Sequence, residues 1–320
     1  MFMSRGGSPE VGPPPNLAVG IIKALRPRQW IKNILVVAAP LATLGGHVHY
    51  DYRDVFYKVG IAFVVFCLAA SSIYLINDAR DVDADRQHPT RRFRPIASGV
   101  VAPSLAYTLA VVLAAAALGI SLMTAPALGL VTAIYLAIQL GYNFGLKHQA
   151  VLDICLVSSG FLIRAIAGGA ATGIPLSQWF LLVMAFFSLF MAAGKRYAEL
   201  HLAERTGAKI RKSLESYTGT YLRFVWTMSA TAVVVFYGLW AFERDGHSGS
   251  WFVVSMIPIV IAVLRYAVDV DSGMAGEPED IVLRDHVIQL LGVAWIAIMC
   301  AAGISGVLAA DGVKAVMIWG

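Results

Sequence analysis

Residues 77–85 read Asn77-Asp-Ala-Arg-Asp-Val-Asp-Ala-Asp85 and follow directly on the apolar stretch Val59–Ile76. Four carboxylates are concentrated here, although only 14% of the chain is charged. A continuous helix, at about 100° per residue, would direct Asp83 away from the other acidic side chains. It would bring four polar side chains to one face: Asn77, Asp78, Asp81 and Asp85. The segment therefore predicts three carboxylates and an amide on a common surface at the end of a long helix.

The chemistry of this cluster points to a metal and a phosphate. Carboxylates this close repel one another and raise each other's pKa unless cations neutralise them. Hard oxygen ligands of this kind suit Mg²⁺ that also binds substrate phosphates. The apolar lead-in places the cluster at a membrane boundary, where ionisable residues indicate function. We interpret Asp78, Asp81 and Asp85 as Mg²⁺ ligands with catalytic Asn77 beside them; the alternative is a solvated helix end.

The composition indicates an integral membrane protein. The 320 residues are 58% hydrophobic with a mean hydropathy of +0.70, whereas soluble domains carry about 25% charged residues. Nine apolar stretches approach the roughly 20 residues that cross a bilayer. They cover residues 30–48, 56–79, 100–122, 125–145, 151–173, 177–194, 222–242, 251–270 and 287–309. We therefore expect an all-α fold with about nine transmembrane helices.

A single membrane domain accounts for nearly the whole sequence. Residues 1–16 are rich in Gly and Pro and lack the apolar core of a cleavable signal peptide, so we expect a disordered tail there. Residues 17–320 then form one transmembrane catalytic domain. The three cysteines lie in separate apolar spans, without the paired spacing of a metal site or disulfide framework.

Basic residues are distributed very unequally between the two sides of the predicted bundle. Residues 80–94 hold five arginines and residues 195–223 hold seven lysines and arginines. The other side has only Arg53, Lys58, Arg244 and Lys314. The positive-inside rule predicts a multi-pass protein of the cell membrane whose acidic cluster faces the cytoplasm. Because the basic residues alternate with the spans, they form no continuous stripe for nucleic acid.

A second polar constellation follows the fourth apolar stretch and comprises Tyr142, Lys147 and Asp153. Lys147 suits a phosphate as a mobile point charge, although a topological anchor is the alternative. Asp153 begins an apolar helix, so capping competes with metal or substrate binding. Arg164 falls on the same helix face as Asp153, inside the span, where it either pairs internally or guides an anionic lipid head group.

Further cations are candidates for phosphate contacts. Arg91 and Arg94 lie in a loop bounded by prolines, where guanidinium forks could take phosphate oxygens; topology alone would also explain them. Lys32 belongs to a basic segment with an interfacial tryptophan, which equally fits a membrane-surface anchor. The run Lys195-Arg196-Tyr197 opens the next basic loop and is a candidate for sugar-phosphate contacts.

The pattern Asn-Asp-x-x-Asp-x-x-x-Asp at residues 77–85 resembles the first signature of the UbiA superfamily of intramembrane prenyltransferases. The usual second signature is a Tyr/Lys element followed by Asp-x-x-x-Asp, which Tyr142, Lys147 and Asp153 match. Val157 replaces its final Asp. Residues 26–33, 194–199 and 277–280 make the chain similar to the decaprenyl-phosphate phosphoribosyltransferase branch. The likeness covers nearly the whole chain after residue 20.

The resemblance implies nine helices around a cytoplasm-facing cavity. It also implies Mg²⁺-dependent transfer of 5-phosphoribose from phosphoribosyl diphosphate (PRPP) to decaprenyl or another polyprenyl phosphate. Diphosphate is released, and the product serves arabinose-donor and cell wall arabinan biosynthesis. In this interpretation the metal neutralises the departing diphosphate while positive charge develops at ribose C1. Lys147 and the loop arginines would hold phosphates.

Two other functions remain open. A conventional UbiA-type prenyltransferase would move a prenyl group from a prenyl diphosphate to an aromatic acceptor, although the valine at position 157 argues against it. A transporter of a phosphorylated lipid or anion would also place charges within the membrane. Such a carrier would exchange its ligand unchanged, whereas an enzyme would release diphosphate. The sequence leaves open whether the chain forms a homo-oligomer.

Overall fold

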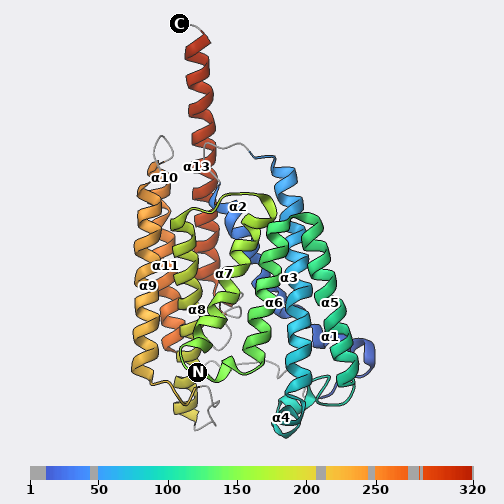
Figure 1. Cartoon of the computed structure of the whole chain (residues 1–320). Coiled ribbons are helices and arrows are strands. Elements are labelled where there is room, and N and C mark those ends of the chain that lie inside the picture. Colours follow the sequence, from blue (N-terminus) through green and yellow to red (C-terminus); the bar gives the residue numbers. More distant parts are fainter. Residues whose placement is uncertain are drawn as a thin grey trace.

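The computed structural model describes residues 12–43, 50–206, 214–243, 249–272, 281 and 284–318. All regular elements in these ranges are helices (Figure 1), which confirms the predicted fold class. Most of the predicted tail, and the whole of the acidic segment 277–280, lie outside the described residues.

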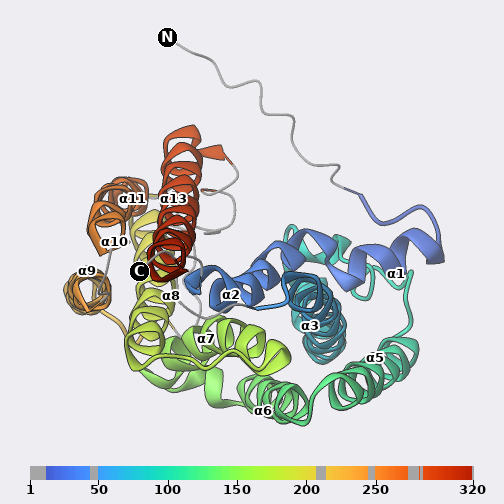
Figure 2. The same ribbon diagram turned by 90° about the horizontal axis from the view of Figure 1, so that it is seen from above.

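Seven helical segments among the described residues are long and apolar enough to cross a membrane. They are α3 (Tyr52–Arg80), α5 (Pro103–Thr124), α7 (Leu152–Thr172), α8 (Gln178–Thr206), α9 (Gly219–Phe242), α10 (Gly249–Val254) continued by α11 (Met256–Asp271), and α13 (His286–Ile318). The predicted fourth span forms α6 (Pro126–Asn143), which packs between α5 and α7 (Figure 2). The chain is thus a multi-pass membrane protein, and the number of nine spans stays a prediction.

The first predicted span, residues 30–48, does not form one continuous α-helix. The chain instead runs through α1 (Leu17–Leu25), the 3₁₀ helix η1 (Pro27–Val37) and α2 (Ala38–Ala42). Arg26 separates the first two with a left-handed backbone (φ 54°, ψ 58°). Figure 2 shows this segment running across the bundle instead of along it. An eleven-residue 3₁₀ helix is unusual, so contacts from the rest of the fold must hold it.

Helix α7 provides those contacts. Buried Arg164 donates hydrogen bonds to the Asn33 side chain in η1 (2.7 Å) and to the Tyr135 hydroxyl in α6 (2.9 Å). Arg164 thus hydrogen-bonds to neutral groups of the protein, and a role in guiding a lipid head group stays a prediction. Four residues further along α7, a Cβ on Gly168 would collide with the Val36 carbonyl group. Because Gly168 has no side chain, the backbone of α7 can lie directly against the backbone of η1.

We expect Gly168→Ala to destabilise the protein because the added methyl group must push η1 away from α7. Overpacking of this kind typically costs about 1 to 3 kcal/mol in the free energy of unfolding. Thermal unfolding of the purified protein in detergent measures the effect. Gly60→Ala in α3 is the matched control, since a Cβ there meets nothing within 4 Å. Equal melting temperatures for the two variants would contradict the close approach.

The long helices alternate in direction, so the functional segments gather at one end of the bundle. In Figure 1 the ends of α3, α6 and α8 and the beginning of α7 all lie at the lower end, and the C-terminus lies at the upper end. Figure 2 shows α5, α6, α7 and α8 following one another around the bundle, with α9 outside α8 and α2 inside. Segments far apart in sequence therefore meet at the lower end.

Candidate functional site

The acidic segment is not a single helix. Helix α3 ends at Arg80, Asp81 links the two elements with φ −88° and ψ 11°, and the short α4 (Val82–Gln87) follows. The prediction of one continuous helix through Asn77, Asp78, Asp81 and Asp85 is therefore wrong at Asp81, whereas Asp78 and Asp85 do share a common surface. The physical reason is a tertiary ion pair, because Arg94 draws Asp85 towards Asp78. Its Nη1 atom lies 3.2 Å from Asp78 Oδ1 and 2.7 Å from Asp85 Oδ2.

Arginines from several segments surround these two carboxylates, which with Asp81 form what we call the acidic centre. Asp78 and Asp85 are both buried, with 3% and 2% exposure. Since one guanidinium nitrogen contacts both, the carboxylates lie side by side. Arg26 Nη2 lies 2.6 Å from Asp78 Oδ1, and Arg91 Nη1 lies 3.9 Å from Asp85 Oδ1. The negative charge of the two buried acidic groups is thus compensated by three cations.

Asp81 extends this centre towards α6. Lys147, in the 3₁₀ helix η3 (Leu146–His148), places its Nζ atom 3.4 Å from Asp81 Oδ2. Asp81 is more exposed than its two acidic neighbours. Asn77 donates to Asp78 Oδ1 at 3.4 Å. Asp83 points outward as predicted, with an 85% exposed side chain paired only to Arg86 among the described residues.

A second centre forms between α7 and α8. Arg196 binds Asp153 in a bidentate manner through two hydrogen bonds, from Nε to Oδ2 (2.7 Å) and from Nη2 to Oδ1 (2.8 Å). The Tyr142 hydroxyl donates to the same carboxylate at 3.0 Å, and Glu199 accepts from Arg196 at 3.0 Å. Asp153 has no exposed surface. The N-cap of α7 is Val151, without a side-chain bond, so Asp153 serves this buried pair and not a cap.

Tyr197 and Lys32 have partners other than the acidic groups of the two centres. The Tyr197 hydroxyl accepts from Arg223 (2.6 Å) and donates to Asp271 (3.2 Å), so its contacts among the described residues are with α9 and α11 and not with either centre. Lys32 donates to Gln29 within η1 at 2.6 Å. Lys195 precedes Arg196 on α8 and is half-buried.

Arg26 is the site residue that sequence reasoning missed. The basic segment around it matched a membrane-surface anchor, and only Lys32 was selected from it. The available signal was an arginine directly before Pro27, because the residue before a proline avoids the helical conformation and breaks the helix there. The break turns the guanidinium towards Asp78.

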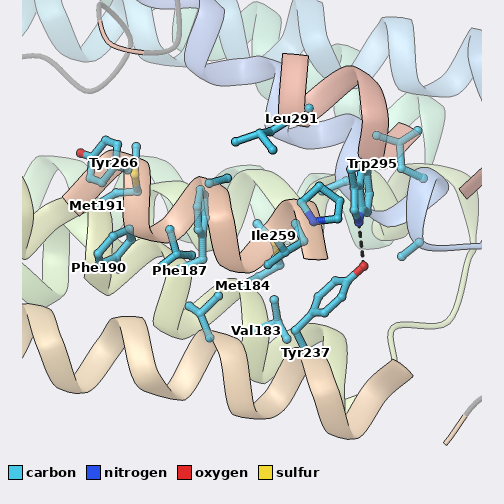
Figure 3. Close-up of a pocket in the computed structure, with 18 of the residues that line it drawn as sticks. Val183, Met184, Phe187, Phe190, Met191, Tyr237, Ile259, Tyr266, Leu291 and Trp295 are labelled. Carbon is cyan, nitrogen blue, oxygen red and sulfur yellow. Dashed lines mark hydrogen bonds between the residues drawn. The ribbon is translucent and has the colours of Figure 1, made fainter. Parts of the chain in front are cut away.

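An apolar cavity of about 390 Å³ lies between η1, α2, α8, α9, α11 and α13. Figure 3 shows apolar and aromatic side chains around it, among them Phe187, Met191 and Ile259. At one end Trp295 donates to the Tyr237 hydroxyl at 2.7 Å. Helix η1 connects the cavity to the acidic centre, because Leu35 lines the cavity and Arg26 directly precedes the helix. The lining is apolar and aromatic, which suits an apolar ligand.

The acidic centre fits Mg²⁺. Asp78 and Asp85 provide adjacent hard oxygen donors, and Asp81 follows on the same segment. The described residues contain no ready-made group of three or more His, Cys, Asp or Glu ligands. Mg²⁺ usually takes one or two protein carboxylates and completes its shell with water and substrate phosphates. The neighbouring arginines can bind the same phosphates.

The fold and the two centres define a class of helical membrane protein that holds acidic and basic groups at helix ends and encloses an apolar cavity. Within this class, the chain belongs to the UbiA prenyltransferase family, which matches residues 34–284. The predicted resemblance is therefore confirmed.

Similar proteins are found in several bacteria. The chain is 72% identical to a decaprenyl-phosphate phosphoribosyltransferase of Mycobacterium tuberculosis over 290 residues, which cover 91% of this chain and 96% of the relative. A protein of the same name from Mycolicibacterium smegmatis is 68% identical over 309 residues, 94% of this chain and 97% of the relative.

Solved structures share the fold. A UbiA homolog from Archaeoglobus fulgidus bound to GPP and Mg²⁺ superposes with a TM-score of 0.66 at 15% identity, covering 90% of this chain and 99% of that one. At this identity the likeness concerns the fold alone.

Proposed function

We propose that this protein transfers 5-phosphoribose from PRPP to the phosphate of decaprenyl phosphate and releases diphosphate. The observation that carries the proposal is the 72% identity to a decaprenyl-phosphate phosphoribosyltransferase over nearly the full length of both chains. The structure supports it by two features of the described residues: an acidic centre suited to a metal diphosphate, and an apolar cavity suited to part of a polyprenyl chain.

The first centre is suited to the leaving group. Mg²⁺ held by Asp78, Asp81 and Asp85 would neutralise charge on the departing diphosphate. Arg26 and Arg94 already lie at these carboxylates, and their guanidinium groups can bind diphosphate oxygens bidentately. Lys147 beside Asp81 adds a mobile cation for a further phosphate.

The acceptor needs little activation. A lipid phosphate is anionic at neutral pH, so its oxygen can form the new bond to ribose C1 while the bond from C1 to the diphosphate breaks. No general base is required for this step. The contacts of Asp153 are consistent with the absence of a general base, because Arg196 and Tyr142 both hydrogen-bond to its carboxylate. We assign this second centre to positioning the sugar phosphate.

The reaction is tested with the purified protein in detergent, supplied with PRPP, Mg²⁺ and decaprenyl phosphate, each omitted in turn. We expect diphosphate release and ribose phosphate on the lipid only when all three are present. Turnover with a prenyl diphosphate and an aromatic acid instead would identify a conventional prenyltransferase. Exchange of an unchanged lipid or anion across vesicles, without diphosphate release, would identify a carrier.

The cellular setting follows from the same proposal. The lower end of the bundle in Figure 1 carries the basic loops, so we place it on the cytoplasmic face of the cell membrane, where PRPP is available. The product would supply arabinose donors for cell wall arabinan. Homo-oligomerisation stays a prediction, which size measurement in detergent can test.

A further inference from the structure

We infer that Tyr217, in the connection between α8 and α9, is a positioning residue that holds a strained turn and so orients Asp153 and Arg196. The strained residue is Val151, directly before α7, with φ 68° and ψ −52°. The Leu152 N–H donates to the Ala150 carbonyl oxygen at 2.8 Å and closes a three-residue γ-turn. This form of γ-turn is rare and strained, and a β-branched residue at positive φ is a clear outlier.

Tyr217 contacts this turn directly. Its hydroxyl oxygen accepts a hydrogen bond from the Val151 N–H at 2.8 Å, across 66 residues of sequence. The tyrosine is buried, with 6% exposure, whereas the Val151 side chain is 49% exposed. Packing of the valine therefore does little to favour the conformation. A strained backbone persists only where its surroundings determine it, and this hydrogen bond is a long-range contact that does so.

The turn sets the beginning of α7, where the second centre lies. Asp153 is two residues after Val151 and is gripped on both oxygens by Arg196. A change in the turn would rotate the first residues of α7 and displace the carboxylate from the guanidinium fork, because two parallel hydrogen bonds tolerate little misalignment. Burial raises the pKa of Tyr217, so the hydroxyl stays neutral beside Asp153 at physiological pH.

The test compares Tyr217→Phe with Tyr221→Phe. Tyr221 stacks on Tyr217 with ring centroids 5.8 Å apart, and it is more exposed, which makes it a matched control. We expect Tyr217→Phe to lower kcat/KM for PRPP about three- to tenfold, the range that corresponds to one lost hydrogen bond. The KM for decaprenyl phosphate should not change, since the apolar cavity is not lined by these residues. Tyr221→Phe should leave both parameters within about twofold of the wild type.

Relieving the strain provides a second test. Glycine adopts positive φ readily, so Val151→Gly should hold the turn without help from the hydroxyl. In that background Tyr217→Phe should cost less than about twofold. If Tyr217→Phe costs as much in the Val151→Gly background as in the wild type, the hydroxyl does not act through the strained turn and the inference fails.

The kinetic part rests on the proposed function, so amide hydrogen exchange gives an independent readout. Tyr217→Phe should speed exchange in the peptide that contains Val151, and Tyr221→Phe should not. Faster exchange in a protein without PRPP turnover would contradict the proposed function and support the contact. Unchanged exchange, or faster exchange with unchanged kinetics, would contradict the positioning role of Tyr217.

Discussion

Asp78→Asn should lower diphosphate release about 10²- to 10³-fold in a protein that still folds. The asparagine keeps the size of the side chain and one hydrogen-bonding oxygen for Arg26 and Arg94. It removes the negative charge that lies at the middle of the acidic centre. Loss of one preorganised charge-stabilising group in an active site has an effect of this order. The assay is diphosphate release with PRPP, Mg²⁺ and decaprenyl phosphate.

Asp83→Asn is the control for this prediction. Asp83 belongs to the same acidic segment, but its side chain is 85% exposed and faces Arg86 on the outside. Turnover should stay within about twofold of the wild type. The melting temperature gives a second readout that does not depend on activity. Mg²⁺ and diphosphate should raise it, because ligands that bind the folded state stabilise that state. Asp78→Asn should lose that rise, and a folded Asp78→Asn protein with normal turnover would contradict the metal role.

The acidic segment shows what local patterns could and could not predict. The apolar stretch predicted a long helix, and α3 covers it. The residue types also predicted an acidic cluster, which the structure contains, and phosphate binding there stays a prediction. The break at Asp81 was missed because it depends on Arg94 contacting Asp78 and Asp85 together. No helical periodicity contains that information, since the arginine comes from a loop nine residues further on.

Long-range contacts explain the other differences. Residues 30–48 are apolar enough to suggest a helix, yet η1 depends on Arg164 and Gly168, more than 130 residues away. Asp153 and Arg196 were both predicted site residues, but nothing in the sequence linked them as partners. The turn at Val151 had no signal at all, because positive φ is normally predicted from glycine. The chemical type of the site residues could therefore be predicted from the sequence, whereas the contacts between those residues could be identified only from the folded structure.

Asp153→Asn should cause the largest loss of stability, about 3 to 5 kcal/mol in the free energy of unfolding. The pair with Arg196 is almost fully buried, with 1% and 5% of the side chains exposed. Removing the Asp153 charge leaves the buried guanidinium with only the partly exposed Glu199 as an anionic partner among the described residues, which is costlier than losing the attraction alone. Denaturant unfolding in detergent measures the change. Asp54→Asn is the control, because its pair with Lys58 is exposed and should contribute about 0.5 kcal/mol or less.

A double variant separates stability from function at the same position. Asp153→Leu with Arg196→Met replaces the ion pair by apolar groups, which often restores most of the lost stability. We expect this double variant to unfold near the wild-type midpoint while its turnover with PRPP stays low. That result would show that the buried ion pair is needed for turnover and not for the stability of the fold. If Asp153→Asn costs no more than Asp54→Asn, the pair is not buried as the structure shows. If the double variant regains turnover, the second centre does not position the sugar phosphate.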